Sequence, residues 1–355
     1  MCVDTEFLRE KTLYPRLCLL QMSVSADDIA CVDPFAGFDL SGVARLMTDE
    51  RVTKVIHACS QDLEAIDHAL GVIPGPVFDT QVAAAFLGHR MQLGYAALVE
   101  SLCDVRLPKA ESLTDWAQRP LDAEQLAYAE DDVRYLPQIY HEMQADLIRR
   151  DRLAWVRPEM EALNDPARVR LSPEEAYTHL RRVTSLTRRQ MGMAREVCAW
   201  RERLAAARDI PRKWVLSDEV VLEVCKRIPR TRERLARIRG AERLSATDAN
   251  ALLEAVYAGL VCPEEELPRY VRRQRPAAEV ESVLDLMYAM LRVISDRSGV
   301  ATQLIATRDD LQDLVSGKSG RLSEGWRAEL AGKPLTRLLE GEVGLTVKNG
   351  RIELL

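Results

Sequence analysis

The sequence lacks the features that mark membrane-spanning and secreted proteins. Its 355 residues contain no uninterrupted apolar stretch of the length, about 18 residues, that a membrane-spanning helix needs. No secretory signal is recognisable at the start of the chain. The eight cysteines are scattered, and no two of them form a C-x-x-C pair. This spacing argues against a zinc site and for reduced thiols, so we expect a cytoplasmic protein with no membrane partner.

Charge of the two signs is unevenly distributed along the chain. The whole sequence has a net charge of −6, but residues 1–150 contain 13 Lys and Arg against 24 Asp and Glu, a net charge of −11. Residues 168–243 contain 20 Lys and Arg against 10 Asp and Glu, a net charge of +10. An acidic half joined to a basic segment indicates a polyanionic partner that is held near an acidic, metal-binding site.

Strand patterns are confined to the first 150 residues, at 4–7, 16–24, 29–33, 52–57 and 77–79. They are joined by helical patterns at 40–47, 60–70, 80–87, 94–103 and 122–150, and the last of these contains Pro137 as a candidate kink. A polar loop covers residues 108–120. Strands followed by alternating helices and strands predict an α/β domain with a mixed sheet.

Beyond residue 150 the patterns are helical. One set covers 187–204, 218–227, 231–238 and 245–258, and a second covers 279–298, 302–316 and 325–339. Proline-containing segments at 158–173 and 263–276 precede the two sets and indicate linkers. Each set begins with a long helix and continues with shorter helices, so we interpret the two sets as an internal duplication. We place domains at 1–155, 181–262 and 278–355, with linkers at 156–180 and 263–277.

Asp4 and Glu6 are the first candidate site residues. They are two positions apart in a predicted strand, so both carboxylates lie on one face. Carboxylates side by side at the edge of a core repel each other, and a hard divalent cation such as Mg²⁺ relieves that repulsion. The alternative is an ordinary strand end that faces solvent.

Two further acidic positions follow along the chain. Asp62 lies in the first turn of the helix predicted at 60–70, where it could equally well complement the helix dipole. Tyr128 and Asp132 are i and i+4 and share one helix face, although a surface position explains that spacing as well. Asp131, at i+3, is a competitor for Asp132.

The order of these motifs resembles the DEDD family of 3′→5′ exonucleases with a tyrosine in the third motif, and ribonuclease D in particular. The resemblance covers essentially the whole chain, and the two helical sets resemble paired HRDC domains. We choose Asp132 over Asp131 because the family spacing is Y-x-x-x-D. The motifs that carry the resemblance are Asp4-Thr5-Glu6-Phe7, His57 with Asp62 and Glu64, Phe78-Asp79-Thr80, Lys109 with Glu111 and Ser112, Thr114-Asp115-Trp116, and Arg119-Pro120-Leu121.

The resemblance implies a ribonuclease H-like domain followed by two HRDC-like domains, and a 3′→5′ exoribonuclease that acts as a monomer on RNA, with transfer RNA precursors as the typical substrate. It implies two divalent ions, Mg²⁺ or Mn²⁺. Asp4 would bridge both ions, Glu6 and Asp132 would hold the ion that carries the nucleophile, and Asp62 would hold the other, partly through water. Tyr128 would orient the attacking water.

The same resemblance gives candidate substrate contacts. Thr5 and Phe7 flank the carboxylates and would contact the terminal nucleotide. Lys109, Trp116 and Arg119 would meet RNA by charge and stacking.

One departure concerns the start of the chain. Only three residues precede Asp4, whereas strands usually have about 5–6 residues. We therefore expect a truncated first strand and a native product that begins upstream. Two other functions remain open. One is a DNA exonuclease of the same fold, and the other is an inactive RNA-binding or scaffold protein that keeps the fold, against which the presence of all four acids and the tyrosine argues.

Overall fold

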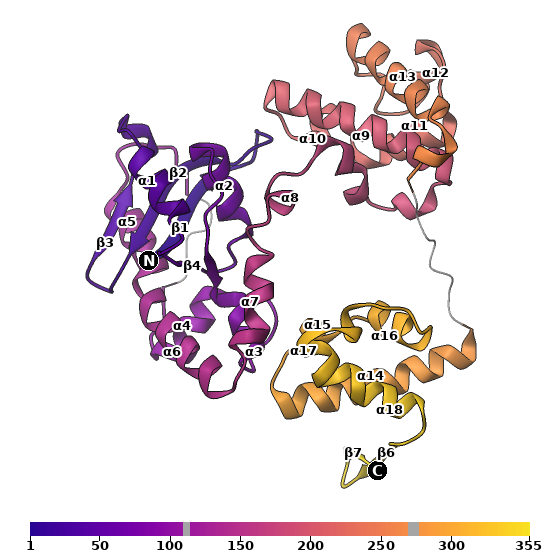
Figure 1. The fold of residues 1–355 in the computed structure, drawn as a ribbon. Helices are drawn as coiled ribbons and strands as arrows, with labels where there is room; N and C mark the ends of the chain where they lie inside the picture. The colour runs from indigo at the N-terminus through magenta and orange to yellow at the C-terminus, as the bar shows by residue number, and fades with distance from the viewer. Residues whose placement is uncertain (109–113, 269–276) are drawn as a thin grey trace.

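The computed structural model describes residues 1–108, 114–268 and 277–355, and Figure 1 shows the chain in three parts. An N-terminal α/β domain comes first. The chain then passes through α8 (Pro166–Val169) into a first helical unit, α9 to α13, and a second helical unit, α14 to α18, follows. None of the helices in these ranges is long and apolar enough to cross a membrane.

The N-terminal domain is built on a five-stranded sheet with the order β3-β2-β1-β4-β5. β1 pairs antiparallel with β2 and parallel with β4, so the sheet is mixed, as the sequence predicts. The strands are β1 (Cys2–Leu8), β2 (Arg16–Ser23), β3 (Ile29–Val32), β4 (Lys54–Ile56) and β5 (Val77–Asp79). The helices of this domain are η1 (Pro34–Ala36), α1 (Ser41–Thr48), α2 (Ser60–Leu70), α3 (Thr80–Phe86), α4 (Tyr95–Cys103), α5 (Ala123–Arg134), α6 (Leu136–Arg149) and α7 (Leu153–Glu161).

The central strand β1 sends alternate side chains into different layers. Val3 belongs to a core cluster that also holds Leu63 and Ile66 of α2. Cys2 belongs to a different cluster, which includes Val133 of α5 and several residues of α6. Since side chains alternate along a strand, the residues that share a face with Cys2 point towards the α5 layer, and those that share a face with Val3 point towards α2.

The first helical unit has its own core, and the second is followed by a hairpin. The first contains η2 (Pro173–His179), η3 (Val183–Ser185), α9 (Arg188–Arg208), α10 (Arg212–Val215), α11 (Asp218–Arg227), α12 (Arg232–Leu235), α13 (Ala246–Val261) and η4 (Glu264–Glu266). The second contains α14 (Ala278–Ser298), α15 (Thr302–Ile305), α16 (Arg308–Val315), η5 (Arg321–Ser323), α17 (Gly325–Arg327), the π-turn η6 (Ala328–Gly332) and α18 (Lys333–Leu339), and the chain ends in β6 (Leu345–Lys348) and β7 (Arg351–Leu354).

The second helical unit packs against α3 and α7 of the N-terminal domain (Figure 1). The ring of Trp326 lies 5.2 Å from that of Phe86 and 5.5 Å from that of Trp155, measured between ring centroids. The buried guanidinium of Arg152 donates hydrogen bonds to the carbonyl oxygens of Phe86 and Ser298. These two parts of the chain therefore share one continuous apolar core.

Several elements differ from those expected from the sequence. The helical run 122–150 breaks at Tyr135, and Pro137 lies in the first turn of the new helix α6. N–H groups in a first turn have no acceptor within the helix, so a proline is tolerated there. Residues 153–161 form α7 with Pro158 inside it, so the expected domain boundary at 155 falls within a helix that packs on the core. The expected helix at 302–316 is divided into α15 and α16.

Strands do occur beyond residue 150, contrary to expectation. β6 and β7 pair antiparallel around Asn349 and Gly350, whose φ angles are +53° and +75°. An Asn-Gly pair between short alternating segments is a strong hairpin signal, and it was available in the sequence. At the other end, β1 has seven residues and pairs with β2 along its length, so as it stands it is no shorter than an ordinary strand.

Candidate active site

Three carboxylates meet where β1 passes beneath α5. Asp4 and Glu6 share a face of β1 with Cys2, and Asp132 comes from α5. One oxygen from each of the three lies within 4.8 Å of the others. The hydroxyl of Ser23 donates to the carbonyl oxygen of Val133 at 2.8 Å, and this bond ties α5 to the sheet beside the three acids.

The electrostatics of this cluster favour a cation. Burial, followed by the charges of Asp62, Asp132 and Glu6, raises the pKa of Asp4 well above its ordinary value. Burial and the charges of Asp132 and Asp62 raise the pKa of Glu6 to about 8. Burial raises the pKa of Asp132 to about 7, although a hydrogen bond with the Tyr128 side chain opposes the shift. The carboxylates thus resist ionising together.

The donor set suits a hard divalent metal ion. Oxygen ligands from carboxylates are the ligands that Mg²⁺ and Mn²⁺ prefer in proteins. Gln21, which lies opposite Asp4 in the β1–β2 register, is fully buried, and its amide has no hydrogen-bond partner among the described residues. Buried polar groups are normally satisfied, so this amide also indicates that a further polar species belongs beside Asp4.

Asp62 reaches the site from the first turn of α2 and is held by Thr5. It is 7% exposed, and the Thr5 hydroxyl donates to its Oδ1 at 2.5 Å. Burial raises the pKa of Asp62 to about 6, while the bond from Thr5 opposes the shift. Asp62 lies outside the cluster of three oxygens, but its charge raises the pKa of both Asp4 and Glu6.

The turn before α2 depends on Asp79, which the sequence analysis did not assign a role. Its carboxylate accepts from the backbone N–H groups of Cys59 at 2.9 Å and Ala58 at 3.2 Å, and it also caps α3 through the N–H of Gln81 at 2.7 Å. Ala58 adopts a left-handed φ of +58°, which costs a non-glycine residue energy unless the surroundings hold it. Asp79 therefore fixes the turn from which Asp62 projects.

His57 lies behind this turn and is not a ligand of the acidic cluster. Its Nδ1 is 2.9 Å from the hydroxyl oxygen of Thr80, and its Nε2 is 2.9 Å from the carbonyl oxygen of Leu93. Burial lowers the pKa of this imidazole. His57 thus acts as a neutral, packed residue.

Tyr128 lies one helical turn before Asp132 on α5. Burial, followed by the charges of Asp132, Glu6 and Asp4, raises the pKa of its phenol above the ordinary value. The phenol therefore keeps its proton and serves as a hydrogen-bond donor. The neighbouring Asp131 is occupied elsewhere, because its Oδ1 accepts from Arg134 Nε at 3.0 Å.

The residues expected to contact substrate have different surroundings. The Trp116 ring lies beside Tyr128, with 6.0 Å between ring centroids, and is half-buried. Phe7 is also half-buried and follows a bulge that begins after Glu6. The Thr5 hydroxyl is already engaged by Asp62, so it acts within the protein. Lys109 lies outside the described residues.

Arg119 anchors a loop and does not present free N–H groups. Its Nε and Nη2 donate to the two carboxylate oxygens of Asp33 at 2.7 and 2.8 Å. Its Nη1 donates to the carbonyl oxygen of Trp116 at 2.8 Å, and its Nη2 to that of Cys18 at 2.7 Å. Arg119 thus holds Trp116 next to Tyr128, which corrects the expectation that its guanidinium is available to RNA. Sequence spacing could not reveal this partner, because Asp33 is 86 positions away.

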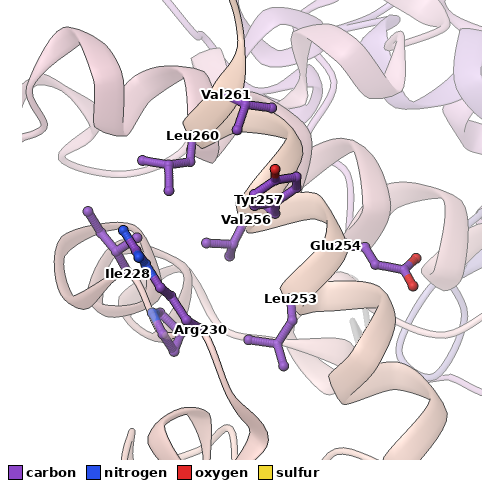
Figure 2. A pocket seen from close by; sticks show the side chains of 9 residues that line it. Ile228, Arg230, Leu253, Glu254, Val256, Tyr257, Leu260 and Val261 are labelled. Atoms are coloured by element: carbon purple, nitrogen blue, oxygen red, sulfur yellow. The ribbon is translucent and has the colours of Figure 1, made fainter.

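A hollow lined mainly by apolar side chains lies elsewhere, on the first helical unit between α13 and the segment before α12 (Figure 2). None of the four acids lines it, and Glu254 is its one acidic residue. Tyr257 is 65% exposed beside it. This hollow lacks the grouped carboxylates that chemistry at a phosphodiester needs.

Comparison with known proteins identifies two families in the chain. The 3′-5′ exonuclease family matches residues 1–148, and the HRDC domain family matches residues 190–256. The chain is 38% identical to ribonuclease D of Acidiphilium cryptum over 357 residues, with 99% of this chain and 91% of that protein covered. It is 40% identical to ribonuclease D of Nitrobacter hamburgensis over 358 residues, with 99% and 92% covered.

The fold is also similar to a solved structure. The crystal structure of Escherichia coli RNase D, described as an exoribonuclease involved in structured RNA processing, superposes with a TM-score of 0.79 at 29% identity. The similarity covers 96% of this chain and 92% of that one. It confirms the fold class predicted from the sequence, a mixed-sheet domain followed by helical HRDC regions.

Proposed function

The chain belongs to the ribonuclease D family of 3′→5′ exoribonucleases, and we propose that it removes nucleotides one at a time from RNA 3′ ends at the cluster of Asp4, Glu6 and Asp132. The observation that carries this proposal is the meeting of the three carboxylate oxygens within 4.8 Å. Their raised pKa values indicate a site whose negative charge is balanced by a cation during catalysis.

Asp4, Glu6 and Asp132 would hold divalent ions, with Asp62 contributing from α2. Two ions, Mg²⁺ or Mn²⁺, fit a set of four carboxylates. When bound, such ions lower the pKa of a water molecule and stabilise negative charge on the phosphate oxygens. Asp62 would act at a longer range than the other three, which agrees with its place outside their cluster.

The other side chains orient the reacting groups. The Tyr128 phenol would donate a hydrogen bond that positions the attacking water, since a protonated phenol cannot serve as a base. The half-buried rings of Trp116 and Phe7 would contact the terminal nucleotide, with Arg119 holding the loop that carries Trp116. Thr5 would keep Asp62 in place through its hydrogen bond.

The substrate class follows from the family. We propose structured RNA, with transfer RNA precursors as the physiological substrate and a monomeric enzyme in the cytoplasm. The helices α14 to α18 would form a second HRDC-like domain. It would be the second copy of the duplication expected from the sequence, and the HRDC match at residues 190–256 would be the first.

A hydrolysis assay tests this function. RNA and DNA strands of one sequence, each labelled at the 3′ nucleotide, are incubated with the protein in Mg²⁺, Mn²⁺ or EDTA. We expect labelled mononucleotide as the first product from RNA in either metal and none in EDTA. Internal cleavage, activity in EDTA, or a preference for DNA would contradict the proposal.

A further inference from the structure

A second hollow on the first helical unit carries a different combination of side chains, and we propose that it binds single-stranded RNA. One base would stack on Trp214, and phosphates would lie against Lys213, Arg239 and Arg243. This inference rests on the proposed function, because it names a second contact for the same RNA.

Trp214 is presented by the short helix α10. The next two residues, Val215 and Leu216, are 7% and 2% exposed and anchor the turn in the core, whereas Trp214 is 55% exposed. Among the described residues, no aromatic ring or guanidinium is stacked on the indole. Tryptophan is rarely left this accessible, and an unpartnered indole is a surface on which any nucleic-acid base can stack.

Cationic side chains line the same hollow as this ring. The hollow is lined by Lys213, Arg239 and Arg243 in addition to Trp214. Its volume of about 620 Å³ is large enough for a nucleotide, by the usual size of ligand clefts. None of these three side chains forms an ion pair in the described ranges of the chain. By contrast, the neighbouring Arg208 pairs with Asp248 at 2.6 Å.

The acids of the hollow offset only part of this charge. Asp248 is taken up by Arg208, and the Glu242 carboxylate accepts a hydrogen bond from the backbone N–H of Gly240. With four cationic and two acidic residues in its lining, the hollow keeps an excess of two positive charges. Unpaired Lys and Arg side chains are the groups that contact phosphates.

Gly240 builds the arginine side of the hollow. Its φ is +97°, and a Cβ at this position would lie 2.7 Å from Cγ2 of Val220 on α11. Any other residue would push the turn after α12 away from α11. The glycine thus lets the turn between Arg239 and Arg243 lie close to Val220 of α11, so the fold shapes this side of the hollow.

Arg208, which lines the hollow, is followed directly by a residue that contacts the N-terminal domain. Asp209, at the end of α9, accepts hydrogen bonds from the backbone N–H groups of Leu13 at 3.1 Å and Tyr14 at 3.4 Å. These residues form the turn that follows β1, the strand that carries Asp4 and Glu6. We therefore infer that an RNA whose 3′ end lies at the acids continues over this turn to Trp214.

The chemistry favours RNA over a protein partner. A protein interface would be expected to place further exposed apolar side chains beside the tryptophan. Here the hollow is lined by three cations without ion pairs, and its Val215 and Leu216 are buried in the core. The apolar hollow beside Tyr257 has the opposite composition (Figure 2) and provides a control from the same helical unit.

Binding of a 5′-labelled 20-nucleotide RNA by the full-length protein, measured by fluorescence anisotropy in EDTA, tests the proposal without hydrolysis. We expect Trp214→Ala to weaken binding by roughly 5- to 100-fold, the scale of losing one base stack. Trp214→Phe should retain most of the affinity because it keeps a ring. A trinucleotide, which is too short to reach from the acids to Trp214, should bind Trp214→Ala and the wild type equally well.

The controls separate this site from general charge effects. Tyr257→Ala removes an exposed aromatic from the other hollow and should bind RNA as the wild type does. Affinity decreases with salt, and this dependence should be weaker in the double variant Arg239→Gln/Arg243→Gln. The magnitude of the slope of log affinity against log salt concentration should decrease by about 0.7 for each lost phosphate contact. Quenching of tryptophan fluorescence by RNA should be smaller in Trp214→Phe than in the wild type.

Two results would overturn the proposal: unchanged RNA affinity in Trp214→Ala, or an equal loss in Tyr257→Ala. Failure of the proposed function is a separate observation, because it is seen as absence of nucleotide release by the wild type in Mn²⁺. The binding measurement uses no turnover, so either statement can fail while the other holds.

Discussion

At the scale of single residues, the chemistry depends on how the protein handles grouped negative charge. Asp4, Glu6 and Asp132 are drawn together by the crossing of β1 and α5, and each has a raised pKa. Tyr128 adds a hydrogen-bond donor to this group without adding charge. The phenol and the carboxyl groups should therefore respond differently to substitution and to pH.

Tyr128→Phe removes the phenol hydroxyl and leaves the metal ligands in place. We expect single-turnover cleavage of a short RNA at saturating Mn²⁺ to slow by roughly 10²–10³, the scale of one lost transition-state hydrogen bond. Mn²⁺ affinity, titrated in parallel, should hardly change. Unchanged cleavage would mean that Tyr128 only packs against Trp116, and a large loss of Mn²⁺ binding would mean that it supports the ligands directly.

The metal-free protein should lose stability as the pH rises. Folded-state pKa values of about 6 for Asp62, 7 for Asp132 and 8 for Glu6 lie above the ordinary 3.8 to 4.5, so the folded chain binds more protons than the unfolded chain over this interval. The free energy of unfolding then falls from about pH 4 to pH 8. Thermal unfolding in EDTA measures this trend, which should be weaker in Asp132→Asn and reversed by Mn²⁺. A stability that increases over the interval in EDTA would refute it.

Some of these residues could be predicted from spacing alone, and others could not. Asp4 with Glu6 and Tyr128 with Asp132 follow from the periods of a strand and a helix. The hydrogen bond between Thr5 and Asp62 joins residues that are 57 positions apart, and the one between Arg119 and Asp33 joins residues that are 86 positions apart. No local pattern encodes such pairs, so the sequence suggested RNA contacts for two side chains that the fold uses internally.

At the scale of elements, the site depends on a strand-to-helix turn that is held from outside. Asp79 at the end of β5 accepts hydrogen bonds from Ala58 and Cys59 before α2 and from Gln81 in α3. One carboxylate thus orders two helix starts. The sequence predicted both helices correctly, since their periodicity is local, but it did not predict their common acceptor.

Asp79→Ala should therefore loosen the turn that carries Asp62. Because the N–H group of Cys59 and three part-buried N–H groups lose their acceptor, we expect a destabilisation of about 1–3 kcal/mol, together with reduced metal-dependent activity. The control is Asp39→Ala, whose exposed carboxylate accepts from Ser41 at the start of α1 and should affect activity little. Denaturant unfolding and RNA hydrolysis are measured on both. Equal effects of the two variants would show that Asp79 is an ordinary helix cap.

Element boundaries were least predictable where tertiary contacts decide them. Pro158 is tolerated inside α7 because Val156 and Met160 on either side of it are buried in the shared core. The hairpin β6–β7 was not predicted, because the helical patterns before it suggested that helices continue. The pair Asn349-Gly350 is nevertheless typical of a hairpin turn.

At the scale of the whole molecule, the chain is divided differently from its sequence pattern. The second helical unit shares a core with the N-terminal domain. The first unit has a separate core, to which the N-terminal domain contributes Leu13. Composition and periodicity report where helices lie, but not which apolar faces meet. Removal of all residues after about 160 would therefore expose Phe86 and Trp155, and substitutions are the better test of RNA binding by the helical units.

Trp326→Ala tests this division. It removes a ring that is 8% exposed and packs between Phe86 and Trp155, so we expect a loss of about 3–5 kcal/mol. Hydrogen exchange should increase in both the N-terminal domain and the second helical unit, but little in α9 to α13. Trp214→Ala removes an exposed ring and should leave stability nearly unchanged. Faster exchange confined to the second unit would contradict a shared core.

The central claim is that the Asp4–Glu6–Asp132 cluster holds the metal ions that hydrolyse RNA from its 3′ end. Its most direct test is the single-turnover rate of nucleotide release from 3′-labelled RNA in Mn²⁺ by Asp4→Asn beside Asp131→Asn. Both changes replace one carboxyl group with an amide, but Asp131 is paired with Arg134 outside the cluster. We predict that Asp4→Asn loses nearly all activity while its metal-free stability holds or rises, and that Asp131→Asn stays active. Full activity in folded Asp4→Asn would contradict the claim.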